Sequence, residues 1–501
     1  MNAAWLPLTT LATSLFAAVI IFSLPEEARR VRTSINLLAA VVKILLVIVM
    51  VGRVSEGYED TFSFQIVGGV DFVLRADALG VMFAGLSSLL WLCTTIYAIG
   101  YLEGAANRKR FFGFFSLCVT STLGVALSGN LFTFLIFYEM LTLSTYPLVV
   151  HAGSAKALAA GRVYLRYTLT AGVVLLLGVV LLYSLTNDHS FASEQGLSPY
   201  LDDHRGLLTL IFALLVGGLA VKAAMVPLHG WLPRAMVAPA PVSALLHAVA
   251  VVKAGAFGIL RVIYDLYGIE LSVELGVTTV LAVAASITII YGSLRAIAQE
   301  ELKPRLAFST ISQVSYVVLG VSLFGPFGTI GALAHLLHQG LMKVTLFFCA
   351  GNYAEELGIH RLDEMDGAGK RMPLTSLAFT VGALGMIGLP PTAGFITKWY
   401  LGMGAIEADM YWVVAVLVAS STLNAIYFLP IVHRLWFREG PAHGKGQWPK
   451  EQPLGRLETH GWLLWPAVLT AVISIGAGLL AGVPFSPLDW ATRVAVGEYL
   501  P

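Results

Sequence analysis

The sequence predicts an all-α polytopic membrane protein with about 14 transmembrane helices and one small β-hairpin. Hydrophobic residues make up 57% of the 501 positions, charged residues only 12%, and the mean hydropathy is +0.79. Soluble globular domains, with roughly 25% charged residues, are excluded by these values. Apolar stretches long enough to cross a bilayer recur along the chain, at 5–24, 34–52, 78–100, 111–128, 131–150, 163–185, 207–226, 240–263, 272–295, 304–324, 328–353, 374–404, 410–436 and 461–482.

Three further segments are predicted from local patterns. The first apolar stretch lacks a basic flank and a small-residue cleavage site, so we expect a retained helix rather than a signal peptide. Between the second and third stretches, residues 61–75 alternate around Gly68-Gly69, which predicts a β-hairpin with a two-residue turn. The polar segment at about 438–460 is predicted to be a mobile or docking segment.

The basic residues predict the orientation. If the N-terminus is extracytoplasmic and successive loops lie on alternate sides of the membrane, few of the 31 Lys and Arg residues lie on the outer side. The positive-inside rule then places the richer loops in the cytoplasm and both termini outside the cell (plasma) membrane. The outer side would hold only Arg53, Arg75, Arg205, Arg261 and Arg493.

Several functional classes are disfavoured by what the chain lacks. The net charge of +1 argues against a nucleic-acid partner. The sequence has no Walker motif, no Gly-rich dinucleotide turn and no Cys/His set for a metal or haem, so we expect no cofactor. Cys93, Cys118 and Cys349 lie in predicted spans, which argues against a disulfide framework. The energy source is then an ion gradient or another subunit.

Five lysines and one glutamate lie inside the apolar stretches. Each lysine at the centre of a membrane helix costs about 2.5–3.5 kcal/mol on insertion scales. The five together would cost on the order of 15 kcal/mol, comparable to the stability of an ordinary domain. Intramembrane ionisable groups of this kind commonly form proton relays. The six residues are Lys43, Lys222, Lys253, Lys343, Lys398 and Glu139.

The first part of this predicted relay is a carboxylate and a lysine. Glu139 is expected to pair with Lys222, so that moving one partner switches the proton affinity of the other. The alternative is a static buried ion pair that only fixes helix packing. His247 and Lys253 are six residues apart, about 120° on a regular helix. Either this helix is distorted near Pro239 and Pro241 or a water joins the two side chains; His247 could also be a hydrogen-bonded core histidine.

The second part lies further along the chain. His335, His338, Gln339 and Lys343 are spaced to share one helix face. At least one of the two histidines is therefore expected to act with Lys343. His229, beside a helix break, is either structural or part of the relay. Lys43 is expected either to contact a partner subunit or to join the relay.

Two apolar stretches are interrupted next to their lysine. Lys222 is followed by Pro227, Pro233, Pro239 and Pro241, and Lys398 follows Gly388-Leu389-Pro390-Pro391. Broken helices at corresponding places in two halves predict a pair of repeats with sites near the membrane midplane. Their freed backbone groups must line a polar cavity or find protein partners.

These motifs resemble a known family. Phe137-Tyr138-Glu139, the break from Lys222 through Pro-Leu-His-Gly-Trp-Leu-Pro233, and Pro239 through His247 are similar to the proton-conducting antiporter-like subunits of complex I, membrane-bound hydrogenases and Mrp-type antiporters. The match covers roughly 75–435. The resemblance implies inverted five-helix repeats, divided as 1–105 (N-terminal helices and hairpin), 106–265 (first repeat), 266–437 (second repeat) and 438–501 (loop and last helix).

The resemblance also implies roles. Glu139 and Lys222 match the family's pair, His247, Lys253 and Lys343 its middle relay, and Lys398 its terminal lysine, which favours the D-type member of the Mrp antiporters. There is one departure: in part of the family a histidine lies four residues before the lysine that matches Lys343, whereas this chain has Gln339 there and a histidine at 338. Lys43 matches nothing in the family pattern.

The implied function is a proton-translocating, non-enzymatic subunit of a multi-subunit Na⁺/H⁺ antiporter, with other membrane subunits as partners. One alternative is a pumping subunit of a redox-driven complex, either complex I or a membrane-bound hydrogenase. A more distant one is an ion-accumulating subunit that acts with a soluble bicarbonate-handling protein.

Overall fold

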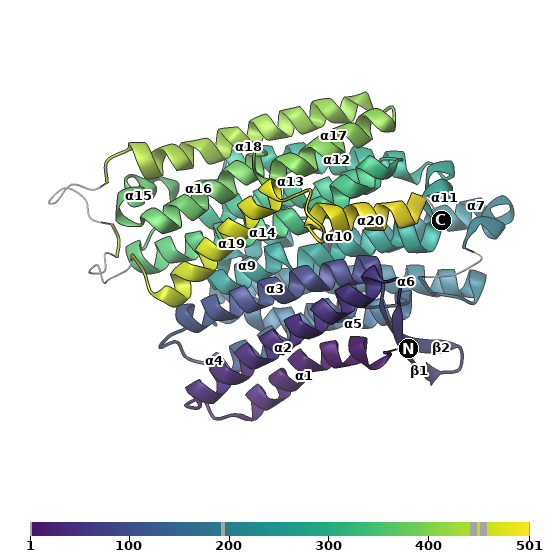
Figure 1. The fold of residues 1–501 in the computed structure, drawn as a ribbon, viewed down its shortest axis with the longest axis horizontal. Helices are drawn as coiled ribbons and strands as arrows, with labels where there is room; N and C mark the ends of the chain where they lie inside the picture. The colour runs from purple at the N-terminus through teal and green to yellow at the C-terminus, as the bar shows by residue number, and fades with distance from the viewer. Residues whose placement is uncertain (1–2, 192–195, 441–447, 451–457, 500–501) are drawn as a thin grey trace.

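The computed structural model describes residues 3–191, 196–440, 448–450 and 458–499. Long helices lie side by side in one bundle, and a two-stranded hairpin stands at the end of the bundle where both chain ends lie (Figure 1). Within the described residues, eleven helices are long and apolar enough to cross a membrane. The chain is therefore a multi-pass, mostly helical membrane protein, as its composition predicts.

The elements follow one another in the predicted order. The N-terminal part comprises α1 (Trp5–Ser23), α2 (Arg29–Ser55), β1 (Asp60–Val67), β2 (Val70–Ala76), α3 (Ala78–Tyr101), α4 (Arg108–Ala126), α5 (Leu131–Val149), α6 (Ala155–Thr186), α7 (Leu201–Lys222) and α8 (Trp231–Arg234). The central part comprises α9 (Ala240–Ala248), α10 (Val251–Arg261), the π-helical turn η3 (Val262–Tyr267), α11 (Ile269–Glu274), α12 (Val277–Ile297), α13 (Leu302–Val321) and α14 (Pro326–Leu357). The C-terminal part comprises α15 (Ala368–Arg371), α16 (Pro373–Ile387), α17 (Ala393–Glu407), α18 (Tyr411–Phe437), α19 (Gly461–Leu479) and α20 (Pro487–Tyr499).

Helices occupy all fourteen predicted ranges, but the number of membrane crossings stays a prediction. α4 begins with Arg108, Lys109 and Arg110, α13 is rich in Ser, Thr and Gln, and α16 has only 15 residues. These three helices fall outside the eleven candidate spans. The two predicted breaks are present: α7 ends at Lys222, and the range 374–404 is divided into α16 and α17.

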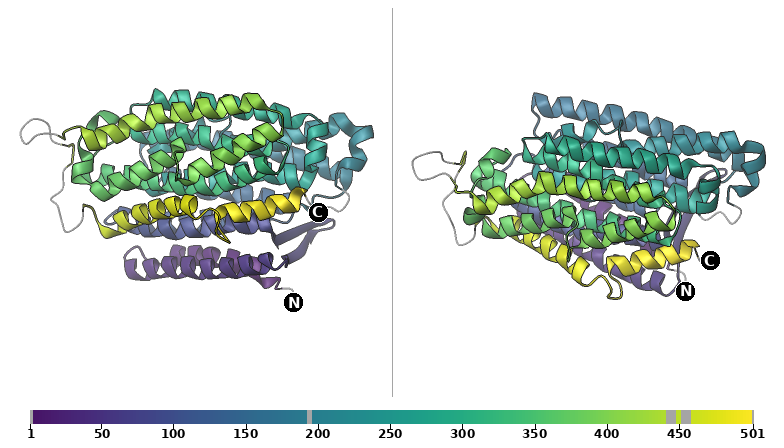
Figure 2. Two further views of the ribbon diagram at one scale, coloured as in Figure 1. Left: turned by 45° about the horizontal axis from the view of Figure 1, so that its top comes forward. Right: turned by 90° about the horizontal axis from the view of Figure 1, so that it is seen from above.

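α20 is a helix that the apolar pattern did not predict. It has 13 residues and carries only four buried side chains, too few for a recognisable apolar stretch. α19 and α20 follow one another along one face of the bundle (Figure 2) and pack against α3 and α14. Because α3 precedes α20 by almost 400 positions, this contact is visible only in the tertiary structure.

The β-hairpin is confirmed. Asp60 pairs with Ala76 and Phe64 with Phe72 in antiparallel register, and Gly68-Gly69 forms the connecting turn. Asp60 fixes the base of the hairpin: its carboxylate accepts from the Ala3 backbone N at 2.8 Å and from Arg53 at 2.5 and 2.7 Å. The hydrogen bond from Arg53 holds the pKa of Asp60 below its ordinary value.

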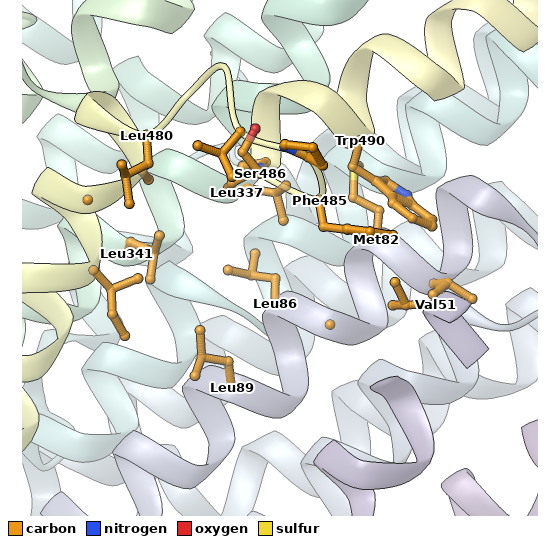
Figure 3. Close-up of a pocket in the computed structure, with 18 of the residues that line it drawn as sticks. Val51, Met82, Leu86, Leu89, Leu337, Leu341, Leu480, Phe485, Ser486 and Trp490 are labelled. Atoms are coloured by element: carbon orange, nitrogen blue, oxygen red, sulfur yellow. The ribbon is translucent and has the colours of Figure 1, made fainter. Parts of the chain in front are cut away.

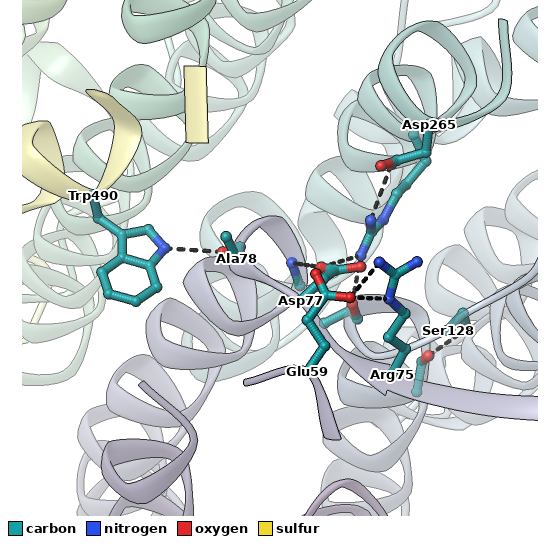
Figure 4. A network of polar contacts seen from close by, with 11 residues as sticks. Glu59, Arg75, Asp77, Ala78, Ser128, Asp265 and Trp490 are labelled. Atoms are coloured by element: carbon teal, nitrogen blue, oxygen red, sulfur yellow. Dashed lines mark hydrogen bonds and ion pairs between the residues drawn. The ribbon is translucent and has the colours of Figure 1, made fainter. Parts of the chain in front are cut away.

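A buried polar network joins the hairpin to the bundle beside it (Figure 4). Asp77 caps α3 by accepting from the Gly80 backbone N at 2.7 Å. Arg261, only 1% exposed, bridges Asp77 at 2.8 Å and Asp265 at 2.9 Å. Two carboxylates thus compensate the charge of Arg261 at the buried end of α10, and its position on the outer side of the membrane stays a prediction.

The predicted mobile or docking segment at about 438–460 falls mostly outside the described residues, which stop at 440 and resume only for 448–450 and from 458. In the short described part, the Lys450 backbone N donates to the Leu357 carbonyl at 3.0 Å, which attaches the segment to the end of α14. The prediction of mobility remains a prediction.

Candidate functional site

The predicted relay residues lie on six helices around the centre of the bundle. The side chains of the middle group are completely buried, while Glu139 and Lys398 are half-buried. Such burial is expected only where charged groups have specific partners or water. The fully buried members are Lys222, His247, Lys253, His335, His338 and Lys343.

Lys222 is the last residue of α7, where the helix breaks. Its Nζ donates to the Tyr138 backbone carbonyl of α5 and lies 3.3 Å from the centroid of the Tyr138 ring. The indole N–H of Trp231 donates to the Val221 carbonyl at 2.7 Å and so satisfies part of the broken helix end. In the sequence, Tyr138 was named only as part of the Phe137-Tyr138-Glu139 motif and was given no role in the relay.

Glu139 interacts electrostatically with Lys222 but forms no ion pair with it among the described residues. Its Oε1 is buried without a hydrogen-bonding partner in the described chain. The carboxylate instead packs against Gly172 of α6, where an added Cβ would lie 2.5 Å from Cδ of Glu139. The two predicted partners are thus neighbours rather than a contact pair.

The helix that carries His247 and Lys253 is distorted between these residues. α9 ends at Ala248 and α10 begins at Val251. Between them, Val249 has a non-helical φ of −133° and Ala250 a non-helical ψ of −88°. Of the two alternatives, distortion is present but lies between the two residues and not near Pro239, which caps the start of α9; the bridging water stays a prediction. Both ring nitrogens of His247 and the Lys253 Nζ have no hydrogen-bonding partner in the described chain.

α14 directs its relay residues toward two different helices. His335 Nδ1 lies 3.0 Å from Thr397 Oγ1 and His338 Nδ1 lies 3.0 Å from the Ala393 carbonyl, both on α17. Lys343 instead donates to Ser309 Oγ and, at 3.3 Å, to the Leu306 carbonyl of α13. The predicted single face is therefore divided: the histidines contact α17 and the lysine contacts α13.

Lys398 satisfies the end of the second broken helix. Its Nζ donates to the carbonyls of Ile387 at 2.7 Å and Met386 at 3.2 Å, and to Ser421 Oγ at 2.9 Å. The two carbonyls belong to the last turn of α16, where intrahelical donors are missing and a cation is favoured.

Tyr316 of α13 links two relay groups and was missed in the sequence. Its ring stacks on His335 at 5.1 Å and lies 5.5 Å from the Lys398 Nζ. The only signal for it is an aromatic residue in a span rich in Ser, Thr and Gln. The other relay groups of the middle part interact electrostatically. Lys253 interacts with His335 and with Lys343, and His247 interacts with Lys343.

Two candidate residues lie apart from this chain of contacts. The ring of His229 lies 5.0 Å from that of Tyr291 and 6.3 Å from that of Phe308, and it has no contact with a relay residue in the described structure. Lys43 lies in the N-terminal helices, 0% exposed, with Ser14 and Trp91 as its neighbours. Burial by its own chain argues against a contact with a partner subunit.

The relay is distinct from the apolar groove between α3, α14 and the α19–α20 connection (Figure 3). This groove has a volume of about 600 Å³ and is lined by side chains such as Leu86, Leu337, Leu480 and Trp490. No group of three His, Cys, Asp or Glu side chains in the described ranges could hold a metal ion.

Residues 128–424 match the family model described as "NADH:quinone oxidoreductase/Mrp antiporter, TM". The chain belongs to this family. It is 37% identical over 420 residues to NADH-quinone oxidoreductase subunit N of Desulforudis audaxviator, an alignment that covers 82% of each protein. These matches confirm the family expected from the sequence motifs; membership of the D-type Mrp group is a finer distinction that they leave open.

Two solved structures have the same fold. A chain of the Mrp complex from Dietzia sp. superposes with a TM-score of 0.86 and 26% identity over 99% of this chain and 98% of that one. A chain of the membrane-bound sulfane sulfur reductase, an archaeal respiratory membrane complex, superposes with a TM-score of 0.85 over 99% of both chains. At 23% identity, this second likeness concerns the fold alone.

Proposed function

We propose that the chain is the proton-translocating subunit of a multi-subunit Na⁺/H⁺ antiporter, most like the D-type member of the Mrp antiporters. The observation that carries the proposal is the row of buried basic side chains from α7 to α17, several with nitrogens unpartnered in the described chain. Lysine and histidine can release and rebind protons when burial and neighbouring charges change. The proton path uses Glu139, Lys222, His247, Lys253, His335, His338, Lys343 and Lys398.

In this mechanism Lys222 and Glu139 gate the first half. When Lys222 transfers a proton to water, Glu139 no longer faces an ammonium, so the charge of one group sets the proton affinity of the other. His247 and Lys253 receive protons at the α9–α10 break, where their nitrogens need water partners. His335 and Lys343 then pass protons toward Lys398, which exchanges them with the far side. His229 is assigned a structural role.

The proposal includes inverted five-helix repeats over 106–265 and 266–437, about 14 crossings, and both termini outside. The two helix breaks, at Lys222 and before Lys398, support the repeat. The position of the hairpin and both chain ends at one end of the bundle supports an even number of crossings (Figure 1). The structural likeness to a chain of an Mrp complex supports the antiporter assignment.

A second candidate is a proton-pumping subunit of a redox-driven complex such as complex I or a membrane-bound hydrogenase. The specific observation in its favour is the 37% identity to NADH-quinone oxidoreductase subunit N. In that complex the same side chains would move protons outward, and electron transfer in other subunits would drive them.

Inverted vesicles that contain the complete native complex test the proposal. Wild type is compared with Lys398→Met, Glu139→Gln and the control Lys156→Met, an exposed lysine at the start of α6. We expect Na⁺ to dissipate a preformed pH gradient in wild type and control but in neither relay variant. Proton uptake driven by NADH or reduced ferredoxin, without a Na⁺ response, would favour the redox complex. Relay variants that behave as wild type under both conditions would refute proton conduction by these residues.

A further inference from the structure

Lys43 is a fully buried cation that the proposed relay does not use. It lies on α2, is 0% exposed, and its Nζ donates to Ser14 Oγ of α1 at 2.5 Å. The ammonium also lies 4.4 Å from the centroid of the Trp91 ring of α3. Ser14 Oγ accepts a second hydrogen bond, from Thr120 of α4 at 2.8 Å. Side chains of four helices therefore converge on this one lysine.

Lys43 belongs to a polar stripe on the buried face of α2. Arg32 is 2% exposed, and Asn36, like Lys43, is 0% exposed, whereas Leu38 and Leu45 on the outer face are 66% and 57% exposed. Asn36 accepts from Ser116 of α4 at 3.3 Å, and Arg32 donates to the Glu26 carbonyl at 3.1 Å. The stripe thus runs from the helix end near Glu26 inward to Lys43.

The side of α3 that is centred on Trp91 carries five buried polar groups without a partner in the described chain. Buried hydroxyls in helices commonly donate to the carbonyl four residues earlier, as Thr120 does to Ser116 at 3.0 Å and Thr345 to Leu341 at 2.8 Å. On α3 this bond is missing, and all five residues are at most 1% exposed. Their spacing of three, four and seven positions places them on one side of the helix around Trp91. They are Ser87, Ser88, Trp91, Thr94 and Thr95.

Few charges surround Lys43. α1 and α3 contain no charged residue, and α4 carries its charges, Arg108 to Arg110, only at its start. The other titratable groups on these helices point elsewhere. Tyr97 donates to the Phe348 carbonyl of α14, and Tyr101 stacks on Tyr97. Cys93 lies beside α19, and Cys118 contacts Thr145 of α5. Arg32 is the other charge on the buried face of α2. No carboxylate in the described chain forms an ion pair with Lys43.

We propose that the α1–α4 bundle contains a second, hydrated proton-binding site, with Lys43 as the group that binds and releases the proton and the unpaired α3 groups as the water ligands. Unsatisfied polar groups in a protein interior are normally bonded to buried water. Water in this stripe would accept the proton that the Lys43 ammonium releases and return it to the neutral amine. α3 also packs against α9 and α14, so this site shares a wall with the helices of the main relay.

Thiol labelling in the native complex tests the hydration. Ser88→Cys is compared with Leu90→Cys, in a chain whose three cysteines are replaced by alanine or serine. Both positions are at most 1% exposed on α3 and lie about 200° apart around the helix. We expect a small cationic methanethiosulfonate to modify Ser88→Cys at least about 10-fold faster, because the reagent reacts through water. Equal, slow labelling of both positions would overturn the hydrated site.

The pH dependence of proton flux tests whether Lys43 binds and releases a proton. Lys43→Met keeps an unbranched side chain without charge, and Lys43→Arg keeps a charge that does not titrate in proteins. We expect both variants to shift the pH of half-maximal proton flux by about 0.5 unit or more. The comparison uses complexes assembled to wild-type amounts. A wild-type profile for Lys43→Arg would show that a fixed charge suffices, and one for Lys43→Met would show that no charge is needed. Either result would overturn proton binding at Lys43.

Discussion

The two broken helices hold their lysines in different ways. Lys222 ends the helix before the first break, and its ammonium is bound by a carbonyl of another helix, α5, beside Glu139. Lys398 follows the second break, and its ammonium binds the carbonyls that this break leaves free, with no carboxylate paired to it in the described chain. In the proposed relay, a proton on Lys222 is thus controlled by an acid, and a proton on Lys398 by a helix end.

The largest expected effect concerns Lys398. Lys398→Gln can still donate to the Ile387 carbonyl but cannot carry a proton, so a purely structural cap would tolerate it. We expect proton flux in vesicles to fall about 100-fold, a typical loss for a proton-transfer group. Thermal stability of the complex is the second measurement. If flux and stability both persist, Lys398 is only a helix cap and the comparison of the two lysines loses its functional meaning.

The next largest effect concerns the position of the Glu139 carboxylate. Gly172→Ala places a methyl group 2.5 Å from Cδ of Glu139, so the carboxylate must move. We expect a roughly 10-fold loss of flux, since proton transfer depends on the placement of the donor and acceptor. Gly217→Ala on α7 is the matched control because its added Cβ meets nothing within 4 Å. Equal flux in both variants would show that the position of Glu139 is unimportant.

A smaller effect is expected at Tyr316, which belongs only to the second half. Tyr316→Phe keeps the ring that stacks on His335 and faces Lys398, whereas Tyr316→Leu removes it. Cation–π contacts contribute about 0.5–2 kcal/mol, so we expect Tyr316→Leu to lose several-fold in flux and Tyr316→Phe less. Vesicle flux at matched protein amounts measures both. The opposite order would assign the function to the hydroxyl instead of the ring.

The smallest effect on flux is expected outside both halves, at Asp60. Its pKa is depressed by Arg53, so its stabilising contribution is complete above the ordinary carboxyl pKa and is lost as the pH falls through the depressed value. Asp60→Asn should lower the thermal midpoint at pH 7 and reduce its sensitivity to acid, with unchanged flux. Intrinsic fluorescence during heating at several pH values measures this. An unchanged midpoint would mean that the hairpin base is held by other contacts.

Much of the site was predictable because intramembrane charges are costly and therefore conspicuous. The positions of Lys222, Lys253, Lys343 and Lys398, and both helix breaks, follow from residue type and from Pro and Gly patterns. The break at Val249–Ala250 could not be predicted in the same way. Neither residue is a helix breaker, so this distortion depends on tertiary packing and not on local preference.

The sequence by itself determined the membrane class, the order and approximate ends of the helices, the hairpin and the candidate titratable groups. These depend on local hydrophobicity, spacing and turn chemistry, which each segment carries alone. Only the tertiary structure decided that Glu139 packs on Gly172, that Tyr316 lies between His335 and Lys398, and that Lys43 lies against the Trp91 ring of α3. Such contacts join helices far apart in the chain, and their geometry depends on how the whole bundle packs.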